Sequence, residues 1–413
     1  MARSDLDIVI TGAGVVTPVG VGLTATIERL ASPQEPGVAV NRGMPQYSGS
    51  APAATFAIAD FDPHALLPGV KGLKNMSRTA QLACAAAALA LADASLPAGE
   101  GAGDEVGIVG GTVYGNVGSV ARFVHEVETE GPRFVDAMLF PNTVLNSPAG
   151  FASIAFNLTG LNSTVNAGPA TGLAALAYAA RLLRRGRAKT ILAGAYEELS
   201  PWLYLGFEAE GRLAPAAGAA GGRPLPYGRD RQGTGLGEGA ALLCLETRAS
   251  ARARGASPRT VIAGLAQGYA AAGDLARCYA GVIRRALAEA EVEPAEVGAA
   301  FVAASGEEEF DLIEGRALSE ALGRPAFERV PLVPLKAWIG ETSGAHGALA
   351  AAVAHGVLVG ERLPRIPAYP LDPALGRATL GGADGQAWVA GKPVLVACAG
   401  RSRSLAALIL TTA

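Results

Sequence analysis

The stretch Thr164-Val-Asn-Ala-Gly-Pro-Ala-Thr-Gly-Leu-Ala-Ala-Leu-Ala-Tyr-Ala-Ala-Arg-Leu-Leu183 decides the fold. It predicts a short strand, a tight Gly-Pro turn and then a helix with an apolar stripe. Such an elbow holds one side chain at a helix N-terminus, where backbone N–H groups and the helix dipole favour a thiolate or an oxyanion. We therefore expect a nucleophile there, yet the sequence has Pro169, whose side chain carries no nucleophilic atom.

Strand and helix signals alternate on both sides of this elbow, which is typical of an α/β fold with buried sheets. A chain of 413 residues exceeds the roughly 250–300 residues that one hydrophobic core supports. We therefore expect two halves, residues 1–246 and 247–413, although no repeat of 20–50 residues is evident. Strands are predicted at residues 7–11, 106–110, 163–166, 189–193, 242–246, 299–303, 393–397 and 405–410, and helices at 76–94, 172–183, 280–291 and 347–358.

Composition excludes several classes of protein. Hydrophobic residues make up 50% of the chain and charged residues only 17%, which indicates a large buried volume and a buried subunit interface. A net charge of −3 argues against nucleic acid as a partner. Glycine-rich stretches at 12–18, 99–103 and 110–115 lack the further residues of nucleotide-binding loops, so we expect no nucleotide cofactor.

The cysteines and the N-terminus give little sign of special chemistry. Cys84, Cys244, Cys278 and Cys398 show neither paired nor metal-ligand spacing, so we expect no disulfide and no metal site. The N-terminus is polar and runs straight into a strand, without a signal peptide. The apolar stretch at residues 80–92 is too short to span a membrane. These features together predict a cytoplasmic protein.

The elbow resembles the active-site stretch of the β-ketoacyl-acyl carrier protein synthases, in which a Cys stands three residues before a Gly. Counting back from Gly172 gives Pro169 at the position of that Cys. Residues 8–20, 157–164, 187–198 and 223–240 are also similar to stretches of this family, so the resemblance covers nearly the whole chain. It implies a thiolase-like fold, in which two similar α/β halves form a five-layer αβαβα arrangement.

The same resemblance assigns the other catalytic positions. Ser305 stands where active ketosynthases carry their first His, and Glu341 stands where they carry the second. Lys336 is retained, whereas His346 lies five residues beyond Glu341 and does not align with a catalytic residue. Condensation needs a thiolate to hold the acyl chain and two imidazoles to polarise the extender thioester. All three groups are missing, so the resemblance implies a chain without catalytic residues.

Two added charges accompany these losses. The gating loop of the family appears as residues 397–404, without its aromatic residue and with Arg401 and Arg403 added. Glu341 would be an anion unless it were buried and protonated. Charge complementarity suggests that it pairs with Lys336 or with Arg401.

This pattern resembles the chain length factors, or ketosynthase β subunits, of type II polyketide synthases. These lack the Cys and pair with an active ketosynthase as a heterodimer, and Ser-Pro-Trp at 200–202 is similar to one of their stretches. Those of the aromatic class usually have Gln at the lost-Cys position, so Pro169 favours a system that makes reduced or polyene chains. The resemblance implies two partners, an active ketosynthase and an acyl carrier protein. The basic run at 181–189 is either a docking site for the carrier or a solvated helix end.

In chain length factors, side chains of this subunit cap the tunnel of the partner. Within the interface stretch at 131–146, we expect Met138, Leu139 or Phe140 to reach toward the partner's active site. The helix after Gly115 is expected to gate the tunnel. Small gate residues would lengthen the product and an aromatic residue would shorten it, whereas a plain core role is the alternative for each. The predicted tunnel and interface residues are Val117, Gly118, Val120, Phe123, Met138, Leu139, Phe140 and Cys398.

Two other functions remain open from the sequence. The first is a divergent acyltransferase or thioesterase-like enzyme that uses Glu341, Ser305 and either Cys398 or His346. The second is a homodimeric acyl-binding scaffold without a ketosynthase partner. For the first of these, Pro169 argues against the usual acyl-enzyme.

Overall fold

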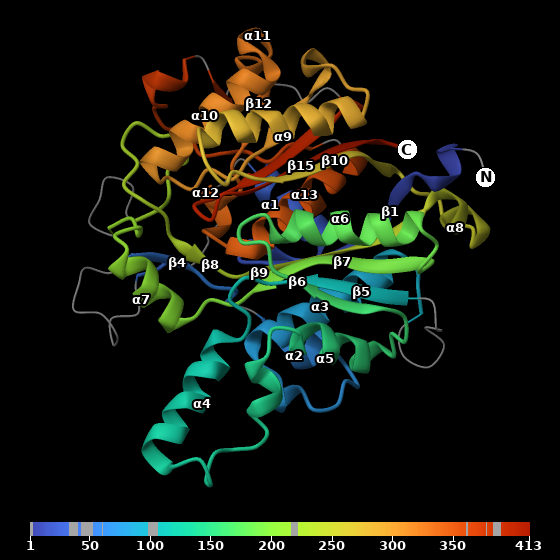
Figure 1. The fold of residues 1–413 in the computed structure, drawn as a ribbon, viewed down its shortest axis with the longest axis vertical. Helices are drawn as coiled ribbons and strands as arrows, with labels where there is room; N and C mark the ends of the chain where they lie inside the picture. Colours follow the sequence, from blue (N-terminus) through green and yellow to red (C-terminus); the bar gives the residue numbers. More distant parts are fainter. Residues whose placement is uncertain are drawn as a thin grey trace.

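The computed structural model (Figure 1) describes residues 3–32, 40–42, 53–59, 61–97, 106–215, 222–360, 362–376, 378–382 and 390–413. The strands are β1 (Ile8–Thr17), β2 (Gly20–Val21), β3 (Val40–Arg42), β4 (Ala54–Phe56), β5 (Val106–Gly111), β6 (Asn162–Val165), β7 (Thr190–Glu197), β8 (Leu236–Gly237), β9 (Gly239–Thr247), β10 (Thr260–Tyr269), β11 (Ala299–Phe301), β12 (Pro331–Val333), β13 (Thr379–Leu380), β14 (Val394–Ala399) and β15 (Ser404–Thr412). The α-helices are α1 (Leu23–Ala31), α2 (Pro63–Leu66), α3 (Arg78–Asp93), α4 (Val117–Glu130), α5 (Ser147–Phe156), α6 (Thr171–Arg184), α7 (Pro201–Ala209), α8 (Arg248–Ala253), α9 (Leu275–Glu289), α10 (Glu308–Leu322), α11 (Arg324–Phe327), α12 (Lys336–Ile339) and α13 (His346–Gly360).

Twelve of these strands are joined by hydrogen bonds, and eleven of them lie on one path. Its order is β13-β12-β11-β14-β15-β10-β1-β9-β7-β5-β6, with β2 paired to β1 at the side. The path consists of two sheets joined where β1 and β10 pair antiparallel, with Ile8 opposite Ile262. A small separate sheet contains β3, β4 and β8.

Helices and sheets alternate in five layers from top to bottom of Figure 1. Helices α9 and α10 cover the sheet that contains β10 and β15, and α3 and α5 cover the sheet that contains β9, β7 and β5. Helices α6 and α13 lie between the two sheets and contact each other. The expected αβαβα arrangement of a thiolase-like fold is thereby confirmed, whereas the division at residues 246 and 247 stays a prediction.

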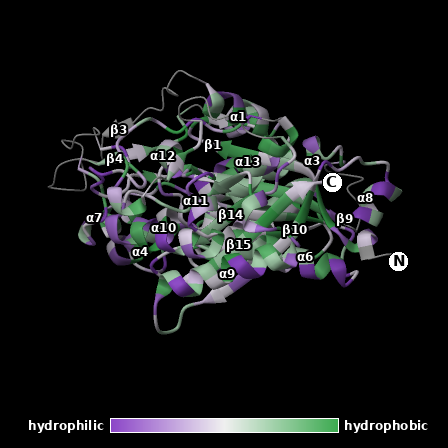
Figure 2. Ribbon diagram, turned by 90° about the horizontal axis from the view of Figure 1, so that it is seen from above, coloured by the Kyte–Doolittle hydropathy of each residue, from purple (hydrophilic) through white to green (hydrophobic). Residues whose placement is uncertain are grey.

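The central helix α13 shows why the middle layer exists. It is apolar on all sides, so it needs apolar cover all round, which the two sheets and α6 provide. Within the described residues, the segment Ser343–Gly360 is long and apolar enough to cross a membrane, but 83% of it is buried inside the protein. It is therefore a core helix. Figure 2 shows hydrophobic residues concentrated in the central strands and hydrophilic residues toward the rim.

Glycines let the outer helices approach the sheets closely. A Cβ at Gly14 in β1 would overlap the carbonyl oxygen of Ala86 in α3, and a Cβ at Gly264 in β10 would overlap that of Ala286 in α9. Each of the two sheets therefore has a glycine at the contact with its covering helix. This close approach is a requirement of packing, independent of any chemistry at the site.

Most predicted elements are present within a few residues of their expected bounds. Several elements, among them strand β10 and helix α10, were not predicted, and the glycine-rich stretch at 99–103 lies outside the described residues. Cys84 and Cys244 are buried in α3 and β9, and burial raises the pKa of each thiol to about 12. Both cysteines are therefore unreactive core residues, as expected.

Helix α4 is the exception to this compact packing, because it projects from the body together with the loop that follows it (lower left of Figure 1). We call residues 117–141 the arm. No residue of the arm is buried, although its helix has 14 residues. Isolated helices of that length are marginally stable in water, so the arm lacks the cover that its apolar residues require.

Substituting Gly14 tests the close approach of β1 and α3. Gly14→Ala is expected to destabilise the fold by about 1–3 kcal/mol or more, because the methyl group overlaps the backbone of α3. Gly206→Ala is the control, since Gly206 is an exposed helical glycine with open space at its Cβ position; it should be neutral or stabilising by up to ~1 kcal/mol. Thermal unfolding of both variants checks this, and equal midpoints would contradict it.

Candidate functional site

The elbow before α6 is held rigid by its own hydrogen bonds. Gly168 has a φ of +55°, which allows the tight turn. The Thr171 hydroxyl donates to the Gly168 carbonyl oxygen at 2.6 Å and accepts the Ala167 N–H at 2.8 Å. The Asn166 side chain accepts the Gly168 N–H at 3.3 Å. The turn that would present a nucleophile is thus fully formed.

Pro169 removes two functions from this elbow at once. Its side chain has no nucleophilic atom, and its backbone nitrogen has no hydrogen to donate to an oxyanion. Its ring also packs against the loop after β14, since a Cβ at Gly400 would overlap the ring. The elbow is therefore closed against the loop that stands at the predicted gating position.

At the second lost-His position, Glu341 forms an ion pair with the retained lysine. Lys336 Nζ donates to Glu341 Oε2 at 2.7 Å, and both side chains are buried. Burial alone would raise the pKa of Glu341, but the Lys336 ammonium and the Ser343 N–H, which donates to Oε1 at 2.7 Å, outweigh it and lower the pKa. Burial likewise disfavours the charged form of Lys336, but Glu341 raises its pKa overall. Glu341 is therefore ionised, and its partner is Lys336 rather than Arg401.

At the predicted position of the first His, Ser305 contacts a second cluster of ion-paired side chains. Its hydroxyl donates to Glu307 Oε2 at 3.1 Å, and only 1% of the residue is exposed. Glu307 also accepts two hydrogen bonds from Arg212, at 2.9 and 3.1 Å, and one from Arg401 Nε at 3.2 Å. These donors occupy both carboxylate oxygens, and Ser305 is buried, so the pair does not resemble an activated serine.

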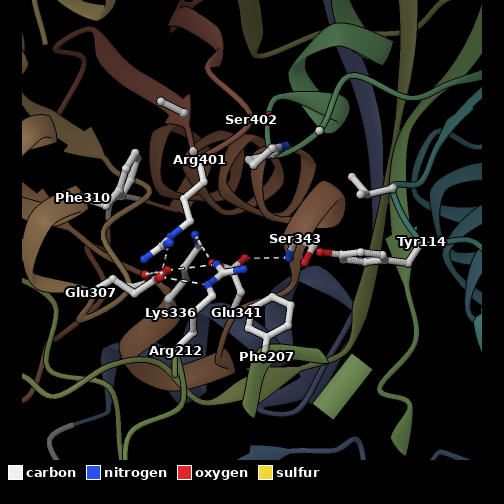
Figure 3. Close-up of a pocket in the computed structure, with 16 residues that line it drawn as sticks. Tyr114, Phe207, Arg212, Glu307, Phe310, Lys336, Glu341, Ser343, Arg401 and Ser402 are labelled. Atoms are coloured by element: carbon white, nitrogen blue, oxygen red, sulfur yellow. Dashed lines mark hydrogen bonds and ion pairs between the residues drawn. The ribbon is translucent and has the colours of Figure 1, made fainter. Parts of the chain in front are cut away.

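These groups surround a small cavity of about 150 Å³ (Figure 3). Ligand pockets usually measure about 300–1,000 Å³, so this one is too small for a long acyl chain. Three cations and two carboxylates line it, and each carboxylate contacts at least one cation. The cavity is lined by Val113, Tyr114, Gly168, Pro169, Phe207, Arg212, Ser305, Glu307, Phe310, Lys336, Glu341, Ser343, Ala399, Gly400, Arg401 and Ser402.

The remaining candidate nucleophile and base, Cys398 and His346, are buried. The Cys398 thiol donates to the Pro169 carbonyl oxygen at 3.0 Å, and burial raises its pKa to about 12, so it is not a thiolate. Burial lowers the pKa of His346 well below its ordinary value, and its Nε2 lies 3.0 Å from the Val302 carbonyl oxygen. Neither residue is among those lining the cavity. Among the described residues, no group of three His, Cys, Asp or Glu could hold a metal ion.

The predicted tunnel residues fall in two places. Those on α4 and in the following segment share the arm, where the Phe123 and Phe140 rings lie 6.2 Å apart. Met138 and Phe140 are more than half exposed, and Val120 is exposed. Cys398 instead lies behind the elbow. The cavity lies close to the arm in sequence, because its lining residues Val113 and Tyr114 come shortly before α4.

Sequence reasoning missed Arg212 and Glu307. Glu307 is two residues from Ser305, so its position offered a signal. Arg212 follows α7 and lies 95 residues away from Glu307 in the chain, and its pairing has no signal in a single sequence. The basic run at 181–189 forms the C-terminal end of α6, where Arg184 lies 3.7 Å from Glu289; its role as a carrier docking site stays a prediction.

Two family models match the chain. Beta-ketoacyl synthase, N-terminal domain, matches residues 5–251, and Beta-ketoacyl synthase, C-terminal domain, matches residues 265–367. The oxytetracycline polyketide putative beta-ketoacyl synthase 1 of Streptomyces rimosus is 33% identical over 369 residues, which cover 85% of each chain.

Solved structures agree with this match. The ishigamide ketosynthase/chain length factor has a TM-score of 0.85 at 24% identity, covering 98% of this chain and 99% of that one. A type II PKS acyl-carrier protein in complex with its ketosynthase bound to the hexaketide has a TM-score of 0.82 at 23% identity, with coverage of 98% and 99%. At these identities, the likeness concerns the fold. Together the matches confirm the predicted resemblance to the ketosynthases.

Removing Glu341 tests the buried ion pair. Glu341→Gln is expected to destabilise the protein by about 3–5 kcal/mol, because the Lys336 charge stays buried without its partner. The double variant Lys336→Met/Glu341→Gln should recover most of this loss. Glu328→Gln, which breaks an exposed pair with Arg324, is the control and should cost less than about 1 kcal/mol. Urea unfolding measures all three, and a stable Glu341→Gln single variant would contradict the ionised pair.

Restoring the thiol tests whether one substitution accounts for the lost chemistry. Pro169→Cys regains a thiol and a backbone N–H, but Ser305 and Glu341 still stand at the two imidazole positions. We expect no decarboxylation of a malonyl thioester above the rate without protein. Release of carbon dioxide from labelled malonyl-acyl carrier protein measures this. A rate near that of an active ketosynthase would show that the imidazole positions are dispensable.

Proposed function

The chain belongs to the β-ketoacyl synthase family, and we propose that it is a non-catalytic chain length factor. In this role it pairs with an active ketosynthase of a type II polyketide synthase and shapes the tunnel that sets chain length. The observation that carries the proposal is the elbow. Its turn is intact, but it presents Pro169, and the Lys336–Glu341 pair fills a position where a ketosynthase has an imidazole.

The state of the cavity supports a lack of catalysis. An acyl-transferring enzyme needs a nucleophile within reach of a base, and the cavity offers Ser305 with its hydroxyl bonded to Glu307. Cys398 is a buried thiol, and His346 is a buried neutral imidazole. These features argue against the divergent acyltransferase or thioesterase.

The arm supports the need for a partner. Large hydrophobic residues are exposed on it or directly after it, namely Val120, Val124, Phe134, Met138, Phe140, Val144 and Leu145. Apolar surfaces gathered in this way mark interaction sites on soluble proteins. The large sheet also ends at β6, which among the described residues pairs with β5 alone, and an open strand edge can accept another chain. We assign the arm and the open edge of β6 to the interface with the ketosynthase partner.

The proposal extends to the pathway and its surroundings. Pro169, where aromatic-class factors usually have Gln, favours a system that makes reduced or polyene chains. The growing chain would be delivered to the complex by an acyl carrier protein, as in the ketosynthase complex that this fold resembles. We place the complex in the cytoplasm. The tunnel residues would be those on the arm, with Gly118 and Phe123 on the helix and Met138, Leu139 and Phe140 after it.

Co-expression with an active ketosynthase tests the proposal. We expect a 1:1 heterodimer by size-exclusion chromatography with light scattering. After incubation with acyl-carrier protein substrates, intact mass should show acylation of the partner alone, because this chain has no usable nucleophile. A stable homodimer would favour the acyl-binding scaffold, and acyl label on this chain would favour the divergent enzyme.

The arm can be tested separately. Phe140→Asp places a charge on an exposed ring that packs near Phe123, and we expect it to weaken the heterodimer at least tenfold, or about 1.4 kcal/mol. Phe140→Leu is the control, because it keeps an apolar side chain and should retain binding. Surface plasmon resonance measures both affinities. Equal affinities with unchanged folding by circular dichroism would exclude the arm from the interface.

A further inference from the structure

Two consecutive glutamates join the end of β7 to the base of the arm. Glu197 is the last residue of β7, and Glu198 follows it; both are buried. Glu197 accepts hydrogen bonds from the backbone N–H groups of Val113 and Tyr114, and from the Thr112 hydroxyl at 3.1 Å. It therefore fixes the segment that enters α4. Burial raises its pKa to about 8.

Glu198 continues this arrangement into the helix itself. Its Oε1 accepts the N–H of Gly118, in the first turn of α4, at 2.9 Å. Its Oε2 accepts the Thr79 hydroxyl at 3.0 Å and the Thr79 N–H at 3.3 Å, in the first turn of α3. One carboxylate thus ties the N-terminus of the projecting helix to the N-terminus of a core helix.

The N-cap residue of α4 does not accept these N–H groups. The N-cap residue Asn116 makes no side-chain hydrogen bond to the first turn, and its Oδ1 instead accepts the Ser77 hydroxyl at 2.7 Å. Helix N-termini leave backbone N–H groups that need acceptors, and a negative charge there is favoured by the helix dipole. For α4, Glu198 supplies such an acceptor from a distant part of the chain.

Gly118 and Glu198 also depend on each other sterically. A Cβ at Gly118 would lie 3.1 Å from Glu198 Oε1, which is tighter than ordinary van der Waals contact. A side chain at 118 therefore requires that either the carboxylate or the helix moves. Because no residue from 117 to 141 is buried, these contacts at its base, together with the contact between α4 and α7, hold the direction in which the arm projects.

We propose that Glu198 is a positioning residue that, with Gly118, fixes the start of α4 and thereby sets the chain length that the arm permits. This rests on the proposed function, in which the arm caps the partner's tunnel. Glu198 touches no substrate and acts through the helix. The absence of a side chain at position 118 is the matching half of the same contact.

A double-mutant cycle in the heterodimer tests the pair. Gly118→Ala should shift the product distribution toward shorter chains, and Glu198→Ala should broaden it, because α4 loses its tether. In the double variant, the methyl group occupies the vacated space, so the effects should be non-additive by about threefold or more in the ratio of long to short products. Glu198→Gln, unlike Glu198→Ala, should leave the product distribution close to that of the unsubstituted chain, since its amide oxygen can still accept the Gly118 N–H. Glu128→Ala, an exposed acid elsewhere on α4, is the control and should change nothing.

Hydrogen exchange at the Gly118 amide gives a second readout that does not depend on product. We expect Glu198→Ala to speed exchange at Gly118 at least tenfold, while exchange in α3 beyond its first turn stays unchanged. Additive effects of the two substitutions, or an unchanged distribution with a reduced yield of heterodimer alone, would overturn the positioning role. If the ketosynthase makes the same products without this chain, the proposed function itself fails, which is a different result.

Discussion

The structure depends on the burial of α6 and α13 between two sheets. Each helix faces apolar strands on both sides, so neither helix would remain folded if one of the two sheets were absent. This constraint fixes the elbow at residues 166–170, because α6 can begin only where the chain leaves β6 and enters the middle layer. A turn that serves catalysis in relatives is therefore kept here by packing. The loss of the nucleophile does not remove the reason for the elbow to exist.

The charges of the cavity follow from one retained residue. Lys336 is buried, and a buried ammonium without a counter-charge costs several kcal/mol. Glu341 supplies that charge 2.7 Å away. The same reasoning applies across the cavity, where Arg212 and Arg401 share Glu307. With Glu341 at one predicted imidazole position and Ser305 bonded to Glu307 at the other, the opposite charges of the cavity pair with one another.

The sequence predicted the elbow, the alternating elements and the positions of Pro169, Ser305 and Glu341, because these depend on local pattern and on motif spacing. It left the partner of Glu341 open between Lys336 and Arg401, since charge alone cannot choose between them. It could not place Arg212 beside Glu307, because a contact between residues so far apart in the chain leaves no local pattern. Strand β10 was missed because its glycines and alanines interrupt the alternation that marks a strand.

An intact elbow without a nucleophilic side chain and a projecting arm occur in the same chain. The helix of the arm is predicted from the sequence, but its lack of burial appears only in three dimensions, where its apolar side chains are half or fully exposed although α4 contacts α7. A surface of this kind has to be held in place before a partner arrives, or its ordering would cost binding free energy. Glu198 accepts the Gly118 N–H at the start of the arm, and Glu197 accepts the N–H groups of Val113 and Tyr114 in the segment that leads into it. The core of the protein therefore fixes the base of the arm, and in the proposed function this prepares the arm for its partner.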